Sequence, residues 1–566
     1  MTGLISCTAW VARGVAQQNP KIYDLDEKEL ERVSALARMN LEDARAELAQ
    51  ATETAQKFKG GGSDDEDEGA EAEADEDGWV DEPNSAAEGD GDGDVAMEDG
   101  VGDSKQIHED DGSHADELAE YKLDDYDHEE QESGQKGTAG MFSNVEGLTY
   151  HADNADDPYI TLKDEEDDEE REELEVLPSD NLLVAAKTED DVSSLEIYVY
   201  DESQDNLYIH HDILLPSFPL CLEWLDYVPG SSTDSGKSGN YVAVGTFDPE
   251  IEIWSLDVLE SMYPDALLGR PDKSKEPDPP LVATKKKKKK GKKGPPKPKT
   301  SAEHHIDAVL GISWNRSHRN LLASASADKT VKLWDLSREL TAPAVRSFDV
   351  HEDKVQAVQW NSLEPTVLLT GSYDRTVRTF DSRSPGSGVG AKVPSDVEAL
   401  RWDPWEGHAF YVSLENGLVL NFDARTLPSN LKSPCAARFT LQAHDSAASG
   451  LDVNTHIRGC IASGGTDGVV KVWNVNETNT KLDVSLVTSR DLGVGKVFSV
   501  TWSPDDPLTL AAAGSQARLQ IWDVASNAAA RKVFGDKLPQ RPWKERGNGG
   551  LVGVVDDDDD EESDAD

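Results

Sequence analysis

The apolar and polar positions between residues 179 and 535 follow one repeating pattern, with a period of roughly 43 residues once two insertions are set aside. Each copy contains a short run of small residues, a polar turn and a run in which apolar and polar residues alternate. Residues 321–336 (LLASASADKTVKLWDL) and 460–475 (CIASGGTDGVVKVWNV) are two examples. Alternation with period two, rich in β-branched residues, is typical of β-strands. The pattern therefore predicts a series of β-hairpins.

Large aromatic residues mark the same repeat. Trp314 is followed twenty positions later by Trp334, and four further pairs share this spacing: Trp360 and Phe380, Trp402 and Phe422, Val453 and Trp473, and Trp502 and Trp522. Another copy holds Trp224 and Trp254, thirty positions apart across a Ser/Gly-rich insertion, and a weaker copy ends at Tyr200. A repeat of about 43 residues has the size of a four-stranded sheet, which is one blade of a β-propeller. One blade cannot bury both of its faces, so neighbouring blades must stack and the ring of blades must close. The sequence thus predicts an all-β fold, a seven-bladed WD-repeat β-propeller.

Two repeats contain a His, a Ser, an Asp and a Trp at matching positions. They resemble the WD-repeat tetrad, in which hydrogen bonds link the indole N–H through Ser and His to Asp. The two sets are His305, Ser324, Asp328 and Trp334, and His444, Ser463, Asp467 and Trp473. A third set, His351, Thr370, Asp374 and Phe380, is incomplete because phenylalanine has no N–H to donate.

A catalytic triad is a poor interpretation of these sets. They recur by register, once per blade, and nothing singles out one exposed hydroxyl beside a base and an oxyanion site. His210–His211 and His304–His305 are adjacent pairs and lack the spacing of a metal site. We therefore expect no enzyme activity, no cofactor, no metal and no small-molecule substrate.

The sequence divides into five predicted regions. They are a short docking motif at 1–22, an amphipathic helix at 23–59, an acidic disordered region at 60–143, the propeller at 144–535 with a lysine-rich insertion at 258–303, and an acidic disordered tail at 536–566. The helix is predicted from a thin apolar stripe of Leu30, Val33, Ala37, Leu41, Ala44 and Leu48, which either packs on the propeller or docks on a partner. How ring closure is shared between residues 145–163 and the last repeat stays open.

Charge is distributed unevenly along the chain. Of 112 acidic and 55 basic residues, positions 1–178 hold 54 acidic and 13 basic ones, and positions 556–566 hold nine acidic ones. No window approaches the roughly 20 apolar residues of a membrane-spanning helix, so no membrane contact is expected. Four widely spaced cysteines without a C-x-x-C pair fit a reducing compartment.

A basic run interrupts the repeats between the second and third blades. Ten lysines fall within fifteen residues: Lys285, Lys286, Lys287, Lys288, Lys289, Lys290, Lys292, Lys293, Lys297 and Lys299. Such a run is either a solvated insertion or a nuclear import signal that also neutralises RNA phosphates. No aromatic residues are interleaved with the lysines, so sequence-specific base recognition is not implied.

The acidic blocks carry the opposite charge and predict basic partners, such as histones, ribosomal proteins or assembly factors, unless they only keep the chain soluble. The densest are 64–77 and 164–175, each with ten acidic residues, and the tail at 556–566. Ser63 and Ser563 precede acidic residues and are possible phosphorylation sites for acidophilic kinases.

Long stretches outside the generic repeat resemble the periodic tryptophan protein 1 family of WD-repeat ribosome assembly factors. They include CTAWVARGVA, ELAEYKLDDYD, YIHHDILLPSFPLCLEWLD and GNYVAVGTFDPEIEIWSLD, together with the KKKKKKGKK insertion. The resemblance runs nearly end to end. It implies a non-enzymatic nuclear and nucleolar scaffold in maturation of large-subunit pre-rRNA, which contacts pre-rRNA and pre-ribosomal assembly factors.

Two alternatives remain open from the residues. One is a chromatin adaptor that binds histones through the acidic blocks, and the resemblance implies that it acts at ribosomal genes. The other is a ubiquitin-ligase substrate receptor, suggested by Phe380-Asp381-Ser382-Arg383 and Phe422-Asp423-Ala424-Arg425, which resemble the W-D-x-R motif of such receptors. An aromatic-Asp pair ends most blades anyway, which weakens the second alternative.

Overall fold

The computed structural model describes residues 3–24, 29–30, 33–34, 174–231, 238–270, 301–338, 342–431, 433, 435–478, 481–537 and 547–554. The chain divides into two units, residues 1–46 with 168–566 and residues 47–167, and all described residues belong to the first. The predicted helix at 23–59 and the acidic region at 60–143 lie almost entirely outside the described residues.

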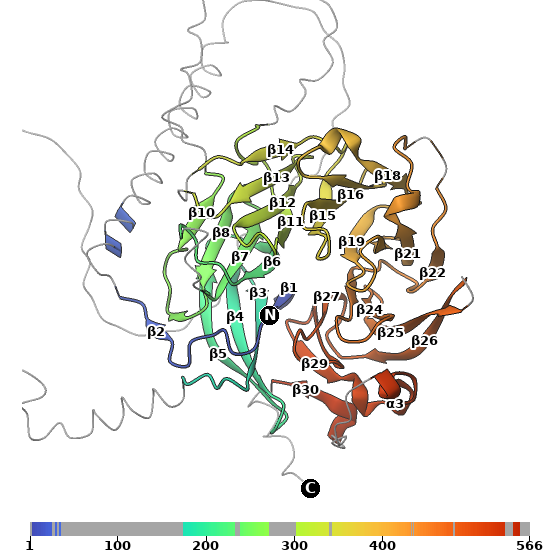
Figure 1. Cartoon of the computed structure of the whole chain (residues 1–566). Coiled ribbons are helices and arrows are strands. Elements are labelled where there is room, and N and C mark those ends of the chain that lie inside the picture. Colours follow the sequence, from blue (N-terminus) through green and yellow to red (C-terminus); the bar gives the residue numbers. More distant parts are fainter. Residues whose placement is uncertain are drawn as a thin grey trace, which may run out of the picture. The chain divides into compact units, whose positions relative to one another are not determined.

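Seven four-stranded antiparallel sheets form the blades of a propeller (Figure 1). The innermost strands contact one another in a closed circle, in the order β1, β6, β11, β15, β19, β23, β27 and back to β1. The seven-bladed fold predicted from the repeats is therefore confirmed.

The strands of the first four blades, each given from the innermost to the outermost, are as follows. Blade 1 has β1 (Gly3–Val11), β3 (Asn181–Glu189), β4 (Val192–Asp201) and β5 (Asn206–Leu215). Blade 2 has β6 (Pro219–Leu225), β7 (Tyr241–Thr246), β8 (Ile251–Ser255) and β10 (Ala266–Leu268). Blade 3 has β11 (Val309–Trp314), β12 (Leu321–Ser326), β13 (Val331–Asp335) and β14 (Arg346–Phe348). Blade 4 has β15 (Val355–Trp360), β16 (Val367–Ser372), β17 (Thr376–Asp381) and β18 (Val389–Lys392).

The last three blades follow the same order. Blade 5 has β19 (Val397–Trp402), β20 (Ala409–Leu414), β21 (Leu418–Asp423) and β22 (Phe439–Gln442). Blade 6 has β23 (Gly450–Val453), β24 (Cys460–Gly464), β25 (Val469–Thr478) and β26 (Lys481–Asp491). Blade 7 has β27 (Val497–Trp502), β28 (Thr509–Gly514), β29 (Leu519–Asp523) and β30 (Leu551–Gly553), with helix α3 (Ala528–Phe534) between its last two strands.

The 20-residue aromatic spacing corresponds to a row of paired residues across three strands. Trp314 pairs with Leu322, and Leu322 pairs in turn with Trp334. Residues paired directly across an antiparallel sheet lie on the same face, so this row presents two large rings and one branched residue to the neighbouring blade. All three residues of this row are at least 96% buried. The equivalent rows recur in the other blades and make up much of the core between them.

Residues 3–11 form the innermost strand of blade 1. The strand pairs with β3 along its whole length, from Gly3 opposite Glu189 to Val11 opposite Leu182. The prediction of a separate docking motif at 1–22 is therefore wrong, and the propeller does not begin at residue 144. The alternating strand pattern of this segment was isolated from its partner by about 170 positions, so no local hairpin indicated the pairing.

The chain departs from the propeller after β1 and returns before β3, and the two ends of this connection lie next to each other. The backbone N–H of Val176 donates to the carbonyl of Gln18 at 2.9 Å. Nearby, β2 (Lys21–Ile22) pairs in parallel with β9 (Val258–Leu259), and the backbone N–H of Gln17 donates to Asp257. These contacts fix residues 17–22, which follow β1, to blade 2 and to the segment that leads into β3.

Two further boundaries differ from the sequence-based prediction. Strands β9 and β10 lie within the predicted insertion at 258–303, and β10 is the outer strand of blade 2. Strand β30 lies within the predicted tail at 536–566, and it pairs with β29 as the outer strand of blade 7. Both outer strands have only three residues, which is too short for a clear alternating pattern.

Polar contacts between blades 1 and 7 close the ring. The hydroxyl of Thr8 is hydrogen-bonded to that of Ser499 at 2.8 Å, and the indole N–H of Trp10 donates to the carbonyl of Thr501. At the end of the strand, the guanidinium of Arg13 contacts the Asp506 carboxylate at 2.7 Å. The Asp506 side chain is only 4% exposed, so this ion pair is largely shielded from water.

We predict that Arg13→Ala destabilises the closed ring, because it leaves the buried Asp506 carboxylate without its cation. The expected loss is about 2 to 3 kcal/mol in the free energy of unfolding, measured by urea denaturation. Arg383→Ala is the matched control, since Arg383 contacts Asp381 at the same 2.7 Å distance but is 73% exposed. Equal, small effects of both substitutions would contradict closure through Arg13.

Candidate functional site

The two faces of the propeller carry different side chains. One face consists of two sets of loops: those that precede the innermost strand of each blade and those that join its second and third strands. We name it the histidine face because His305, His351 and His444 lie there. The opposite face, which we name the tryptophan face, lies at the ends of the innermost strands, where Trp314 and Trp360 stand. Because successive strands are antiparallel, this assignment follows from chain direction alone.

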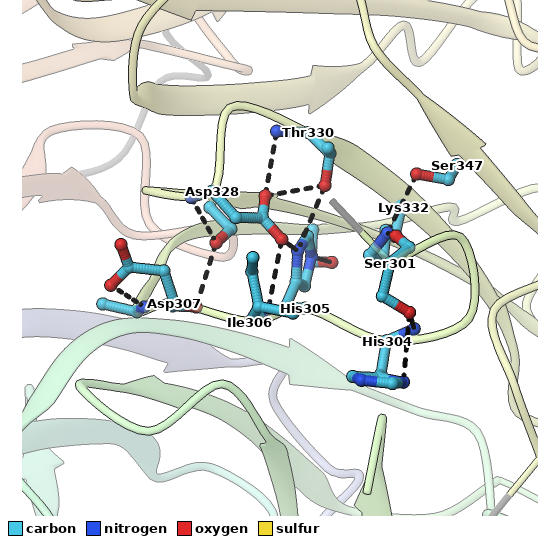
Figure 2. Close-up of polar contacts among 12 residues, drawn as sticks. Ser301, His304, His305, Ile306, Asp307, Asp328, Thr330, Lys332 and Ser347 are labelled. Carbon is cyan, nitrogen blue, oxygen red and sulfur yellow. Dashed lines mark hydrogen bonds and ion pairs between the residues drawn. The ribbon is translucent and has the colours of Figure 1, made fainter. Parts of the chain in front are cut away.

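The histidine in blade 3 links two loops and two strands through buried hydrogen bonds (Figure 2). His305 Nδ1 lies 2.9 Å from the Asp328 carboxylate, and its Nε2 lies 2.7 Å from the Ser324 hydroxyl. The Trp334 indole N–H donates to the same hydroxyl at 2.8 Å. Thr330 donates to Asp328 from the other side at 2.7 Å. The chain of contacts thus joins the loop before β11 to strands β12 and β13.

The protons in this network can be assigned from its geometry. The Ser324 oxygen accepts the indole proton, so its own proton is free to donate to His305 Nε2, and His305 Nδ1–H then donates to Asp328. Burial lowers the pKa of His305, which keeps the ring neutral. Although burial opposes ionisation of Asp328, hydrogen bonds from His305 and Thr330 lower its pKa to about 2. A neutral imidazole therefore holds an ionised carboxylate.

Blade 6 repeats the arrangement and blade 4 modifies it. His444 contacts Asp467 at 3.1 Å and Ser463 at 2.8 Å, and the Trp473 indole N–H donates to Ser463 at 2.9 Å. In blade 4, His351 contacts Asp374 at 3.0 Å and Thr370 at 2.8 Å, and Phe380 supplies no donor. Ser324 and Ser463 are fully buried, so neither hydroxyl is exposed to a substrate in solution.

A buried lysine extends the blade 3 network to the end of the lysine-rich insertion. Lys332 is completely buried, and its ammonium donates to the Ser301 carbonyl at 2.7 Å and to the Ser347 hydroxyl at 2.9 Å. Figure 2 shows Ser301 beside His304, whose backbone N–H donates to the Ser301 hydroxyl. Burial lowers the pKa of Lys332. This contact fixes the point at which the chain returns to the propeller.

Blade 2 replaces the tetrad with a carboxylate. Trp254 donates its indole N–H to Glu252 at 2.9 Å, on the same strand. Glu252 is 6% exposed, and burial raises its pKa to about 7, an effect that the Trp254 hydrogen bond opposes. The nearby charges of Asp248 and Glu250 raise the pKa further. No pattern in the sequence indicated that this acid is buried.

The tryptophan face surrounds a cavity of about 360 Å³ at one end of the central channel. Six of the seven innermost strands place a tryptophan there, and β23 places Val453 instead. The six are Trp10, Trp224, Trp314, Trp360, Trp402 and Trp502. Trp10 was not recognised from sequence as a member of this series, because its row partners Leu183 and Tyr198 lie far along the chain.

Polar side chains next to these tryptophans connect successive blades. Four of these side chains accept the backbone N–H of the tryptophan in the next blade. They are Glu223 from Trp314, Ser313 from Trp360 at 3.1 Å, Gln359 from Trp402, and Asp452 from Trp502 at 2.8 Å. Arg401 bridges blades 5 and 6 through an ion pair of 2.9 Å with Asp452. These contacts fix the angle between neighbouring blades more specifically than apolar packing alone.

Comparison with known proteins places the chain in a family. The pattern described as "WD domain, G-beta repeat" matches residues 296–335, 343–381 and 436–474. An uncharacterised WD repeat-containing protein of Schizosaccharomyces pombe is 44% identical over 96% of this chain and 93% of its own. Periodic tryptophan protein 1 of Saccharomyces cerevisiae is 34% identical over 94% of this chain and 90% of its own.

This chain belongs to the periodic tryptophan protein 1 family. The family's homolog in Drosophila melanogaster is 29% identical over 66% of this chain and 74% of its own. The resemblance deduced from the sequence is thereby confirmed. The tryptophans at the ends of the innermost strands are the periodic feature of this family member.

Several of the predicted site residues lie outside the described residues. They include all ten lysines between Lys285 and Lys299, together with Ser63 and Ser563. The two chain ends that flank the lysine-rich segment are described, at Arg270 and Ser301. Both belong to the connection between β10 and β11, so the segment is attached on the histidine face.

The described residues contain neither a membrane-spanning helix nor a metal-binding cluster. No helix among them is long and apolar enough to cross a membrane. Across the described parts of the chain, no group of three or more His, Cys, Asp or Glu side chains could hold a metal ion. The adjacent histidines His210 and His211 hydrogen-bond to each other at 2.7 Å on strand β5.

Replacing Trp334 tests the tetrad of this periodic tryptophan protein 1 family member. Trp334→Ala should lower the free energy of unfolding by about 3 to 5 kcal/mol, through the cavity and the lost hydrogen bond. Trp334→Phe keeps most of the volume and should cost about 1 kcal/mol. Trp405→Phe is the control, since Trp405 is 43% exposed. An unchanged urea midpoint for Trp334→Ala would disprove its role in the core.

Glu252 gives a prediction about pH. Its folded-state pKa of about 7 exceeds the unfolded value, so the folded chain binds an extra proton and Glu252 costs stability as pH rises from about 4.5 to 7. Glu252→Gln removes this titration. The melting temperature of the variant, relative to the parent, should therefore rise between pH 5 and pH 8. Glu352→Gln, at an exposed position, should show no such trend, and a trend shared by both variants would refute the assignment.

Proposed function

We propose that this chain is a non-enzymatic scaffold of the nucleus and nucleolus that supports maturation of the large ribosomal subunit. In this proposal the propeller binds pre-ribosomal assembly factors and the segment containing Lys285 to Lys299 binds pre-rRNA. The observation that carries the proposal is the similarity to periodic tryptophan protein 1 over at least 90% of both chains. The ribosomal role itself comes from the resemblance of the sequence to that family.

The construction of the propeller supports a scaffold. The His–Ser–Asp sets are buried within blades and serve to fix loops, and the tryptophan rows are buried between blades. What remains at the surface is two loop-covered faces and seven outer strands, which are suited to binding several proteins at once. A rigid ring of this kind holds its partners at fixed angles.

Attachment of the lysine-rich segment supports an RNA contact. Ten positive charges within fifteen residues bind a phosphate backbone by releasing condensed counterions, and such binding needs no fixed structure. Lys332 holds the returning chain at Ser301, so the segment is tethered at a defined point of the ring. The proposal is therefore that RNA is held beside the histidine face without base-specific recognition.

Histone binding is the second candidate function. The described loops of the histidine face carry more acidic than basic residues. The acidic ones include Asp349, Glu352, Asp353, Asp396 and Glu415. Part of the chain is also 25% identical, over 40% of its length, to Histone acetyltransferase type B subunit 2 of Debaryomyces hansenii. An acidic face attracts basic proteins, including histones and ribosomal proteins.

The lysine-rich segment is tested by two charge variants of the full chain, each fused to an independent import signal. In one variant the ten lysines from Lys285 to Lys299 become serine, and in the control they become arginine. The serine variant should lose most of its crosslinked RNA and its nucleolar signal, and the arginine variant should keep both, because counterion release depends on charge. The readouts are sequencing of crosslinked RNA and fluorescence microscopy.

The outcomes separate the two candidates. Recovery of large-subunit rRNA precursor with assembly factors from the parent, and its loss in the serine variant, supports the scaffold. Recovery of histones without rRNA, unchanged in the serine variant, supports the chromatin adaptor. Equal rRNA crosslinking by the parent and the serine variant would show that the lysines do not bind RNA.

A further inference from the structure

A second cavity, of about 420 Å³, opens on the side of the ring between blades 3, 4 and 5. Phe348 from the outer strand of blade 3 and Phe380 from blade 4 lie in its wall, with their ring centroids 5.2 Å apart. Arg378 from β17 and Leu431 from a loop of blade 5 complete it. The wall of the cavity thus combines apolar side chains with polar groups, one of which is a guanidinium.

Arg378 is partly buried and lacks the partners that its counterparts have. Its Nε is inaccessible to solvent and has no hydrogen-bond partner, and no ion pair or hydrogen bond engages its guanidinium in the described part of the chain. Asp349 also lines the cavity but forms no ion pair with Arg378. A buried donor without a partner is costly, so the Nε–H of Arg378 is left unsatisfied by the described chain.

Two other blades have a lysine at the position equivalent to Arg378, and each lysine ammonium has a hydrogen-bond acceptor. Lys332 in blade 3 and Lys471 in blade 6 each stand two positions before the blade's tryptophan, as Arg378 stands two before Phe380. Lys332 donates to the Ser301 carbonyl and Lys471 to the Ala443 carbonyl, both at 2.7 Å. Only at Arg378, of these three, does no group of the described chain accept from the cation.

The residue opposite Arg378 explains why space remains there. Ser347 pairs across the strands with Lys332 and accepts a hydrogen bond from it, whereas Gly390 pairs with Arg378. A Cβ atom at Gly390 would lie 2.5 Å from the Val377 carbonyl and 3.0 Å from Leu431. The close approach of the Val377 carbonyl on the neighbouring strand therefore requires glycine, and the absence of a side chain leaves the guanidinium without an acceptor.

We propose that this cavity binds a carboxylate side chain of a partner protein. A guanidinium binds a carboxylate through two parallel hydrogen bonds, and such a pair is strong where water is excluded. The wall of Phe348 and Phe380 accommodates an apolar residue next to the acid. The volume suits two or three residues of an extended peptide. This site is independent of the RNA contact proposed above.

The test is a selection of displayed random heptapeptides on the full chain. Peptides retained by the parent should be enriched in Asp or Glu next to an apolar residue. Arg378→Gln should reduce their retention at least tenfold, and Arg378→Lys should restore only part of it, because lysine cannot form the paired hydrogen bonds. Arg375→Gln is the matched control, since Arg375 lies on the same hairpin but contacts Asp396 outside the cavity.

A second variant covers the case in which Arg378→Gln fails to fold, which thermal unfolding would reveal. Ser429 lines the cavity from an exposed loop position, so Ser429→Trp should block entry and abolish retention without removing the guanidinium. Competition by inorganic phosphate but not by acetate would reassign the site to a phosphate group. Selected peptides without an acidic preference, or retained equally by Ser429→Trp, would overturn the proposal.

Discussion

The structure depends on closure of the ring. Each blade presents a row of large side chains to its neighbour, and such a row is shielded from water only when blades stand on both sides. The contact that closes the ring joins blade 1 to blade 7, through β1, β27 and β28. If that contact opened, the rows of two blades would be exposed at once. The polar contacts of Thr8, Trp10 and Arg13 with blade 7 therefore stabilise far more than the residues they join.

Polar groups inside the ring follow one rule with local variations. A buried charge at a given register is acceptable where the blade supplies a partner, as His305 does for Asp328 or the Ser301 carbonyl for Lys332. Where the partner changes, the chemistry changes with it, so that Glu252 replaces the tetrad in blade 2 and Arg378 remains without an acceptor in the described part of blade 4. Comparison of equivalent positions within one molecule thus separates structural groups from candidate binding groups.

The sequence predicted the elements that are local and missed those that are not. Alternating residues and the spacing of Trp314 and Trp334 identify a hairpin, because both partners lie within one short segment. The pairing of β1 with β3 depends on contacts across some 170 residues, and the three-residue strands β10 and β30 carry too little pattern. The tetrads were visible because their spacing is fixed by the repeat. The environments of Glu252 and Arg378 were not, since burial and missing partners arise only from the packed blades.

The position of β1 has a consequence for the synthesis of the chain. A ribosome makes residues 3–11 before their partners in β3 and β28, which emerge roughly 170 and 500 residues later, at about 5 to 20 residues per second. The nascent segment CTAWV is apolar and has no neighbour until then. The ring therefore cannot close until β27 and β28 have been made, and protection of the first strand by a chaperone during that interval would favour correct folding.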